Sequence, residues 1–157
     1  MIVTDARRQG VILALDLASN TGWCGGAPGI APELGTVTLE GTSIGARGAA
    51  LDDWLWTTCD LMKPTLIVFE APLPVHSSIK AGRLAFGLAM VVEIVGYRRE
   101  IPVKECAVTS VRKRIIGSGK ADKDAVMAWC RSRGWTPNSL DAADAAALWE
   151  LACRVRT

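Results

Sequence analysis

Four carboxylates occupy positions from which they could act together. Asp16 lies near the end of one nearly continuous apolar run and Glu70 ends a second, while Asp141 and Asp144 are three residues apart in an alanine-rich segment. If the four meet, they repel one another unless a cation neutralises their charge. Ligation by oxygen atoms, with no nearby His or Cys, suits Mg²⁺ or Mn²⁺. Two such ions, about 3.5–4 Å apart, activate a water molecule and stabilise the leaving oxygen in phosphodiester hydrolysis.

Two buried strands must position the first pair of acids. Residues 11–17 and 66–70 have the apolar pattern of strands covered on both faces. A right-handed crossover helix between them would make the strands parallel near neighbours. Their carboxyl ends would then place Asp16 and Glu70 at one edge of the sheet, where open α/β sheets bind ligands. The simpler explanation of either acid alone is that strands end at solvent.

A final helix must position the second pair. Asn138 or Ser139 can cap this helix, which is expected to run to about Cys153. Asp141 and Asp144 are i and i+3, so they share a face with the apolar stripe that packs on the sheet. Acids in a first helical turn also favour the helix dipole, which is sufficient to explain Asp141 alone.

The other periodic segments complete an α/β domain. The chain has 157 residues, half of them apolar, which is the length of one domain with a real core. We therefore expect a single domain over residues 1–157, with residues 1–10 as a flexible extension. The order of elements predicts a mixed sheet with early hairpins and late crossovers. Further strands are expected from 23, at 35–39 and at 101–103, and further helices at 44–62, 77–99, 110–116 and 121–133.

Basic residues are concentrated between Arg98 and Arg133, although the formal net charge of the chain is only +2. Glycines in the turn at 117–119 would let backbone N–H groups approach a phosphate. This segment is expected to face a nucleic-acid backbone, and Lys80 and Arg83 would extend that surface. The alternative is a helix–helix turn with solvated faces. The basic side chains that flank the turn are Arg112, Lys113, Arg114, Lys120 and Lys123.

Cysteine and histidine usage excludes several classes. Five cysteines without a C-x-x-C pair, together with one histidine, His76, argue against a zinc site. His76 could act as a general base or nucleophile, or simply lie in a loop near nucleic acid. The N-terminus lacks the apolar region of a signal peptide, and the most apolar stretch, 84–95, is too short to span a bilayer. We expect a cytoplasmic protein with no membrane contact and no small-molecule cofactor.

The long helix expected at 77–99, which Ser77 or Ser78 can cap, is apolar nearly all round, and a sheet can cover only one side of it. A monomer would expose a patch of the kind that marks an interface, which predicts a two-fold homodimer. The alternative is that neighbouring helices bury the whole patch. Its apolar residues are Leu84, Phe86, Leu88, Met90, Val91, Ile94 and Val95.

Several of these segments resemble RuvC-type Holliday junction resolvases. The basic segment 111–123 is similar to that family's segment just upstream of its last acids, and 78–82 to the start of its long helix. The resemblance runs from about residue 11 to 152, and Glu70-Ala71-Pro72 is more similar to the phage-borne branch. Three further segments are similar to those that carry the family's acidic tetrad, namely Leu15-Asp16-Leu17, Val68-Phe69-Glu70 and Asp141-Ala142-Ala143-Asp144.

The resemblance implies a ribonuclease H-like fold with a five-stranded mixed sheet flanked by helices. It also implies an Mg²⁺- or Mn²⁺-dependent homodimer, with two ions per site, that nicks two strands of a four-way junction symmetrically. Such an enzyme serves DNA recombination and repair in the bacterial cytoplasm, or phage DNA processing if it is phage- or prophage-encoded. Asp16, Glu70, Asp141 and Asp144 would be catalytic metal ligands, and Arg112 and Lys123 match basic positions near the scissile phosphate.

The chain departs from the family at two places. The family's Asp-Pro-Gly after the first strand is Asp16-Leu17-Ala18 here, and Leu73 stands near the position of a base-stacking aromatic. Residues 15–22 also resemble the first phosphate loop of sugar kinases and actin-like ATPases, which need two such domains. A non-catalytic junction-binding module is a third interpretation, which would predict the loss of one or more acids.

Overall fold

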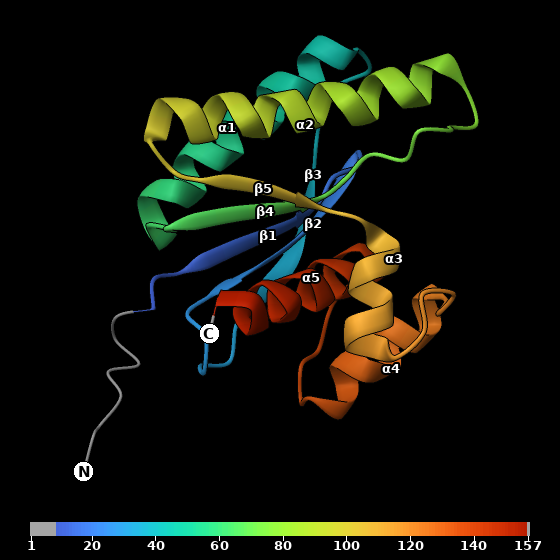
Figure 1. Cartoon of the computed structure of the whole chain (residues 1–157). Helices are drawn as coiled ribbons and strands as arrows, with labels where there is room; N and C mark the ends of the chain where they lie inside the picture. The colour runs from blue at the N-terminus through green and yellow to red at the C-terminus, as the bar shows by residue number, and fades with distance from the viewer. Residues whose placement is uncertain (1–8, 157) are drawn as a thin grey trace.

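The computed structural model describes residues 9–156, and its central element is one five-stranded mixed sheet (Figure 1). Most of the N-terminal extension predicted for residues 1–10 lies outside the described residues. The strand order is β3-β2-β1-β4-β5, with β1 antiparallel to β2 and parallel to β4, as the sequence predicts. The strands are β1 (Ile12–Asp16), β2 (Asn20–Gly26), β3 (Glu33–Thr38), β4 (Leu66–Glu70) and β5 (Val103–Cys106).

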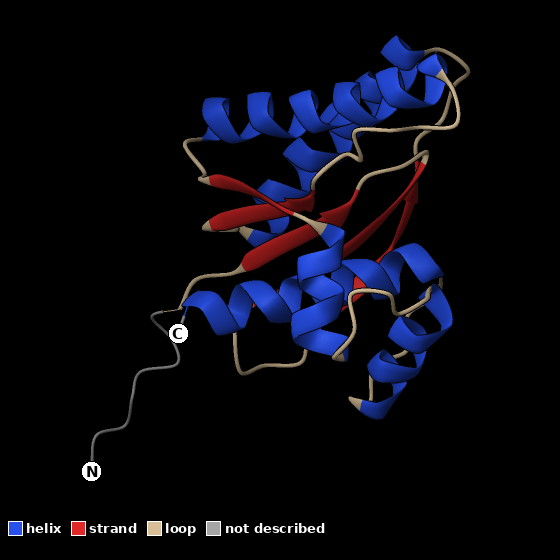
Figure 2. Ribbon diagram, turned by 45° about the vertical axis from the view of Figure 1, so that its right-hand side comes forward, coloured by secondary structure: helices blue, strands red, loops and turns tan. Residues whose placement is uncertain are grey.

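Helices cover both faces of the sheet, and Figure 2 shows the three layers. The pair α1 and α2 lies on one face, and α5 lies on the other with the shorter helices beside it. None of the helices in residues 9–156 is both long and apolar enough to cross a membrane. The helices are α1 (Ile44–Met62), α2 (Ile79–Arg99), α3 (Val108–Val111), the π-helical turn η2 (Arg112–Ile116), α4 (Lys123–Ser132) and α5 (Leu140–Arg156).

Alternation along the central strands divides the core in two. Ile12 and Ala14 of β1 point to the α5 side, whereas Leu13 and Leu15 point to the side of α1 and α2, and all four side chains are fully buried. Asp16 follows Ile12 and Ala14 in this alternation along β1. Its side chain must therefore lie on the face of the sheet that α5 covers.

The second strand differs from its prediction. The sequence predicts a strand from residue 23, but β2 begins at Asn20, which pairs with Thr38, and Gly22 pairs with both Asp16 and Thr36. Asn20 and Gly22 are of residue types that are depleted in strands, and pairing on both sides of the strand overrides that preference.

Two later elements also have different bounds. The fifth strand spans 103–106 instead of 101–103, because Val103 to Cys106 is the segment in register with the end of β4. The short helix predicted at 110–116 begins at Val108 instead, and its second half is the π-helical turn η2. The bounds predicted for α1 and β4 are confirmed.

Candidate active site at the carboxyl ends of the strands

The sheet brings Asp16 and Glu70 together. Leu15 of β1 stands opposite Phe69 of the parallel strand β4, so the next residue on each strand is one of the acids. Both acids follow the alternation toward the α5 face, and both line one cavity at the carboxyl ends of the strands. The predicted meeting of these two side chains at one sheet edge is confirmed.

Helix α5 brings the second pair to the same edge. Ser139 caps the helix, since its Oγ accepts a hydrogen bond of 2.9 Å from the Ala142 N–H. The Ser139 hydroxyl also lies 2.6 Å from Thr36 Oγ1 of β3, which ties the start of the helix to the sheet. Asp144 is 4% exposed, so it points toward the core as its place in the apolar stripe predicts.

Gly22 allows this helix to approach the sheet, although no local sequence pattern singles it out. A Cβ atom at Gly22 would overlap the carbonyl group of Asp141, so any side chain there would displace the first turn of α5. Gly22 is also the β2 partner of Asp16. The role of Gly22 is evident only from the contact between β2 and α5, which are far apart in the sequence.

Burial and repulsion between neighbouring carboxylates raise the pKa of three of these acids. The pKa of Asp16 lies well above its usual range because the group is buried and because Glu70, Asp144 and Asp141 are close to it. Burial, and then the charge of Asp144, raises the pKa of Glu70 to about 7. Burial also raises the pKa of Asp144, although Lys123 and Arg112 partly offset that effect. These couplings place the four acids in one electrostatic cluster.

Two of the predicted basic residues lie inside this cluster. Lys123 Nζ is 3.3 Å from Asp141 Oδ1 and 3.7 Å from Asp144 Oδ2, and Arg112 Nη2 is 3.6 Å from Asp144 Oδ1. Burial lowers the pKa of Lys123, but its carboxylate neighbours outweigh burial and leave that pKa raised. The turn η2 carries Arg112 inward, where its Nε is buried with no hydrogen-bond partner among the described residues.

The remaining predicted basic residues do not touch the acids. Lys113, Arg114 and Lys120 are exposed around the turn that separates η2 from α4, and Lys80 and Arg83 are exposed in the first turns of α2. Their exposure leaves these five side chains available to a partner outside the molecule.

The oxygen atoms and the negative charge of the four carboxylates suit a divalent cation. In residues 9–156 no group of three Asp, Glu, His or Cys side chains is arranged to hold a metal ion as it stands. Lys123 and Arg112 instead supply the positive charge next to Asp141 and Asp144. Four mutually repelling carboxylates, rich in oxygen donors, are the environment that hard cations such as Mg²⁺ neutralise.

A cavity of about 180 Å³ opens beside Asp16 and Glu70. The other residues that line it are Leu17, Ala85 and residues of the loop between β4 and α2. His76 is one of these loop residues. Sequence patterns do not predict this cavity, because it forms between a loop and two strand ends.

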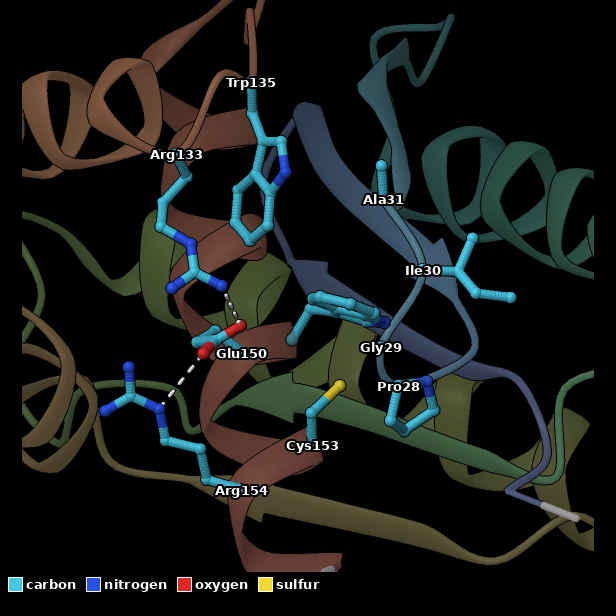
Figure 3. Close-up of a pocket in the computed structure, with 10 residues that line it drawn as sticks. Pro28, Gly29, Ile30, Ala31, Arg133, Trp135, Glu150, Cys153 and Arg154 are labelled. Atoms are coloured by element: carbon cyan, nitrogen blue, oxygen red, sulfur yellow. Dashed lines mark hydrogen bonds and ion pairs between the residues drawn. The ribbon is translucent and has the colours of Figure 1, made fainter. Parts of the chain in front are cut away.

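A second cavity, of about 450 Å³, lies at the other end of α5 (Figure 3). Its buried acid, Glu150, pairs with Arg133 at 3.4 Å and with Arg154 at 3.1 Å. The indole of Trp135 lies edge-to-face on that of Trp149, and Arg133 stacks over Trp135. Because Glu150 is already neutralised, this cavity lacks the uncompensated carboxylates of the strand edge.

The fold is found among known structures, although the sequence matches no protein-family model and no curated protein. The structure of RuvC from Thermus thermophilus superposes with a TM-score of 0.75 at 17% identity, over 93% of this chain and 95% of that one. The T. thermophilus RuvC complex with a Holliday junction substrate gives 0.76 at 16% identity, over 94% and 95%. The yeast mitochondrial Holliday junction resolvase Ydc2 gives 0.63 at 14% identity, over 94% and 81%. The chain therefore has the fold of the RuvC resolvases, which confirms the predicted RuvC-type resemblance and the ribonuclease H-like fold class.

Proposed function

We propose that the protein is a divalent-metal-dependent endodeoxyribonuclease that resolves four-way or other branched DNA. One observation carries the proposal: β1, β4 and α5 bring four carboxylates to one edge of a RuvC-like sheet, where burial and mutual repulsion raise the pKa of Asp16, Glu70 and Asp144. One of the solved structures with this fold is a complex with a Holliday junction substrate, which supports branched DNA as the partner.

Asp16, Glu70, Asp141 and Asp144 would hold the metal, Mg²⁺ or Mn²⁺, as two ions per site. When bound, these ions would supply an activated water and charge neutralisation at the leaving oxygen. The carboxylates would hold the ions from three rigid elements, two strand ends and one capped helix.

The basic residues would bind the DNA backbone. Arg112 and Lys123 lie beside the acids and present N–H donors for phosphate oxygens next to the site of cleavage. The exposed residues Lys80, Arg83, Lys113 and Lys120 would extend the contact over α2 and the turn before α4. These basic side chains would concentrate positive charge at the edge of the sheet where the DNA would be cut.

We further propose that the protein acts as a homodimer built on α2. Phe86 and Met90 are 54% and 59% exposed, so the neighbouring helices do not bury the apolar surface of this helix. A groove of about 400 Å³ between α1 and α2 adjoins them and is lined by Ile44, Val91 and Ile94 among others. Two copies related by a two-fold axis would cover this surface and present two sites to two symmetry-related strands.

The biological setting that fits this activity is DNA recombination and repair in a bacterial cell, or phage DNA processing. The three solved structures described above are RuvC-type resolvases that this chain matches over at least 93% of its own length, which favours the nuclease over the kinase-like alternative. The binding-module alternative predicts the loss of an acid, and all four acids are present.

A cleavage assay tests the proposed function. The protein is incubated with four-way, three-way and linear duplex DNA of matched sequence, with Mg²⁺, with Ca²⁺ or with EDTA. We expect Mg²⁺-dependent paired nicks in the four-way junction, none in linear duplex, and none with Asp16→Asn. Cleavage that persists in EDTA or in Asp16→Asn would reject the metal site, and junction binding without cleavage in Mg²⁺ or Mn²⁺ would favour the binding module.

A further inference from the structure

His76 lines the same cavity as the two strand acids. It lies in the loop that leads from β4 to the first turn of α2, which Figure 1 shows at the same edge of the sheet. The cavity of about 180 Å³ is smaller than the roughly 300 Å³ at which small-molecule pockets begin. A single phosphate group of a DNA strand is a better match to this size than a free ligand.

The imidazole is held in a defined orientation. Its ring packs edge-on against Phe86, with 6.0 Å between centroids and 75° between planes. The ring also lies over Gly82 one turn earlier in α2, since a Cβ built there would be at van der Waals distance, 3.5 Å, from His76 Cδ2. The ring of this loop residue is therefore packed against α2.

The two ring nitrogens have different environments. Nε2 is buried and has no hydrogen-bond partner among the described residues. Nδ1 is not one of the buried, unpartnered atoms, and no hydrogen bond to it is found in residues 9–156, so solvent reaches it. A neutral imidazole has one N–H donor and one bare nitrogen. A hydrogen on Nε2 would be buried without an acceptor, whereas a hydrogen on Nδ1 can be hydrated, which favours the Nδ1–H tautomer.

A phosphate in this cavity would need a hydrogen-bond donor. Asp16 and Glu70 line the cavity and repel a phosphate, and the side chains of the other lining residues apart from His76, such as Leu17 and Leu73, are apolar. Among the described residues that line the cavity, and apart from the two acids, His76 is the one whose side chain can donate a hydrogen bond. Arg112 and Lys123 supply donors from α5's side of the site, so His76 would complete the set from the opposite side.

We propose that His76 is a further substrate-contacting residue, whose Nδ1–H donates a hydrogen bond to the DNA phosphate beside Asp16 and Glu70. The inference rests on the proposed nuclease function and deepens it, because it adds a residue from outside the acidic and basic sets.

Replacement of His76 by the two amides tests which nitrogen matters. An asparagine amide nitrogen reaches the position of Nδ1, whereas a glutamine amide nitrogen reaches that of Nε2. In single-turnover cleavage of a saturating four-way junction, His76→Ala and His76→Gln should lose about 10- to 100-fold in rate, the worth of a hydrogen bond to a charged group. His76→Asn should stay within a few-fold of the wild type, and thermal melts of all three variants check folding.

Nuclear magnetic resonance supplies a readout that does not depend on cleavage. His76 is the single histidine of the sequence, so its ring ¹⁵N signals need no assignment. We expect the Nδ1–H tautomer in the free protein and a shift of the Nδ1 signal when four-way junction DNA is added in EDTA. Unchanged ring signals, or the Nε2–H tautomer, would overturn the proposal.

The outcomes separate this inference from the function on which it rests. If the wild type cleaves junctions and His76→Ala cleaves them as fast, the nuclease proposal stands and the proposed role of His76 is rejected. Equal losses in His76→Asn and His76→Ala would assign the ring a packing role and also overturn the inference. If the wild type cuts no DNA but its Nδ1 signal shifts with the junction, the nuclease proposal fails and the contact stands.

Discussion

Gly22 of β2 lies directly against the backbone carbonyl of Asp141 at the start of α5. Because Gly22 is also paired with Asp16 across the β1–β2 ladder, one residue without a side chain joins the strand acid to the helix acids. The separation of the two acid pairs is therefore set by backbone packing, and a single added methyl group should change it.

Gly22→Ala tests this arrangement. The added Cβ would push the first turn of α5 away from the sheet, so we expect cleavage to fall at least about tenfold and stability to fall by about 1–3 kcal/mol, the usual cost of overpacking. Gly25→Ala, in the same strand, is the matched control, since its closest contact would be the flexible end of Met62. Equal cleavage per folded molecule by the two variants would show that Gly22 does not position the site.

Asp144→Asn should abolish cleavage and leave the fold intact. The Asp144 carboxylate is buried and its pKa is raised, so a neutral side chain of the same shape removes an unfavourable charge. We expect the free energy of unfolding in EDTA, from urea titration, to be unchanged or higher, and junction binding to persist. Measurable Mg²⁺-dependent nicking by this variant would take Asp144 out of the catalytic set.

The stability of the metal-free protein should fall as the pH rises. An acid whose pKa is higher in the folded than in the unfolded state binds extra protons in the folded state, so it loses stability as it ionises. For Glu70 the window runs from its ordinary value of 4.5 to about 7, and Asp16 acts in the same direction. Urea titrations in EDTA from pH 5 to pH 8 measure the effect.

Two comparisons identify its source. Glu70→Gln should flatten this pH dependence, because the amide does not titrate. Mg²⁺ should restore stability at the alkaline end, since an ion that binds only the folded state stabilises it by mass action. A metal-free protein that becomes more stable between pH 5 and pH 7 would contradict the repulsion inferred among these acids.

Removal of Arg112 or Lys123 should weaken DNA binding and reduce its dependence on salt. Each phosphate contact contributes about 0.9 to the slope of log affinity against log salt on duplex DNA. We therefore expect Arg112→Ala and Lys123→Ala each to lower that slope by about one in fluorescence anisotropy titrations with a four-way junction. Arg131→Ala, an exposed change at the far end of α4, should leave the slope unaltered. If all three variants behave alike, the basic residues form only a solvated face.

Local sequence patterns are sufficient to predict the elements with strong periodicity. The apolar runs of β1 and β4 and the Ser139 cap of α5 are all evident in short stretches of sequence, and together they assign the four acids to three elements. Weak patterns mislead where neighbouring strands decide the conformation. The Asn–Thr–Gly start of β2 is a strand because strands pair with it on both sides.

The part of the site that the sequence did not predict depends on contacts between distant segments. Nothing in residues 112–123 indicates that Lys123 pairs with Asp141 in the free protein, because that contact requires α4 to pack beside α5. The contact of His76 with Phe86 likewise requires the loop to fold back on α2. Spacing identifies which residues can do chemistry, and only packing shows which of them face one another.

The last prediction concerns the apolar surface of α2. Met90 is 59% exposed on the helix that also carries the exposed residues Phe86 and Ile94, next to the groove against α1. Exposed apolar surface of this extent marks an interface, and a second copy covers it with the same residues. In sedimentation velocity at tens of micromolar we expect a dimer for the wild type, and Met90→Glu should dissociate it, because two glutamates would be buried at the axis without partners.

Val155→Glu provides the matched control, since Val155 is similarly exposed at the far end of α5 and lies away from α2. This variant should stay dimeric and cut both strands of a junction within one binding event. Met90→Glu should bind junctions more weakly and nick them one strand at a time, because each monomer carries only one set of the four acids. A wild-type protein that sediments as a monomer both alone and on junction DNA would refute the dimer, and with it the symmetric pairing of nicks.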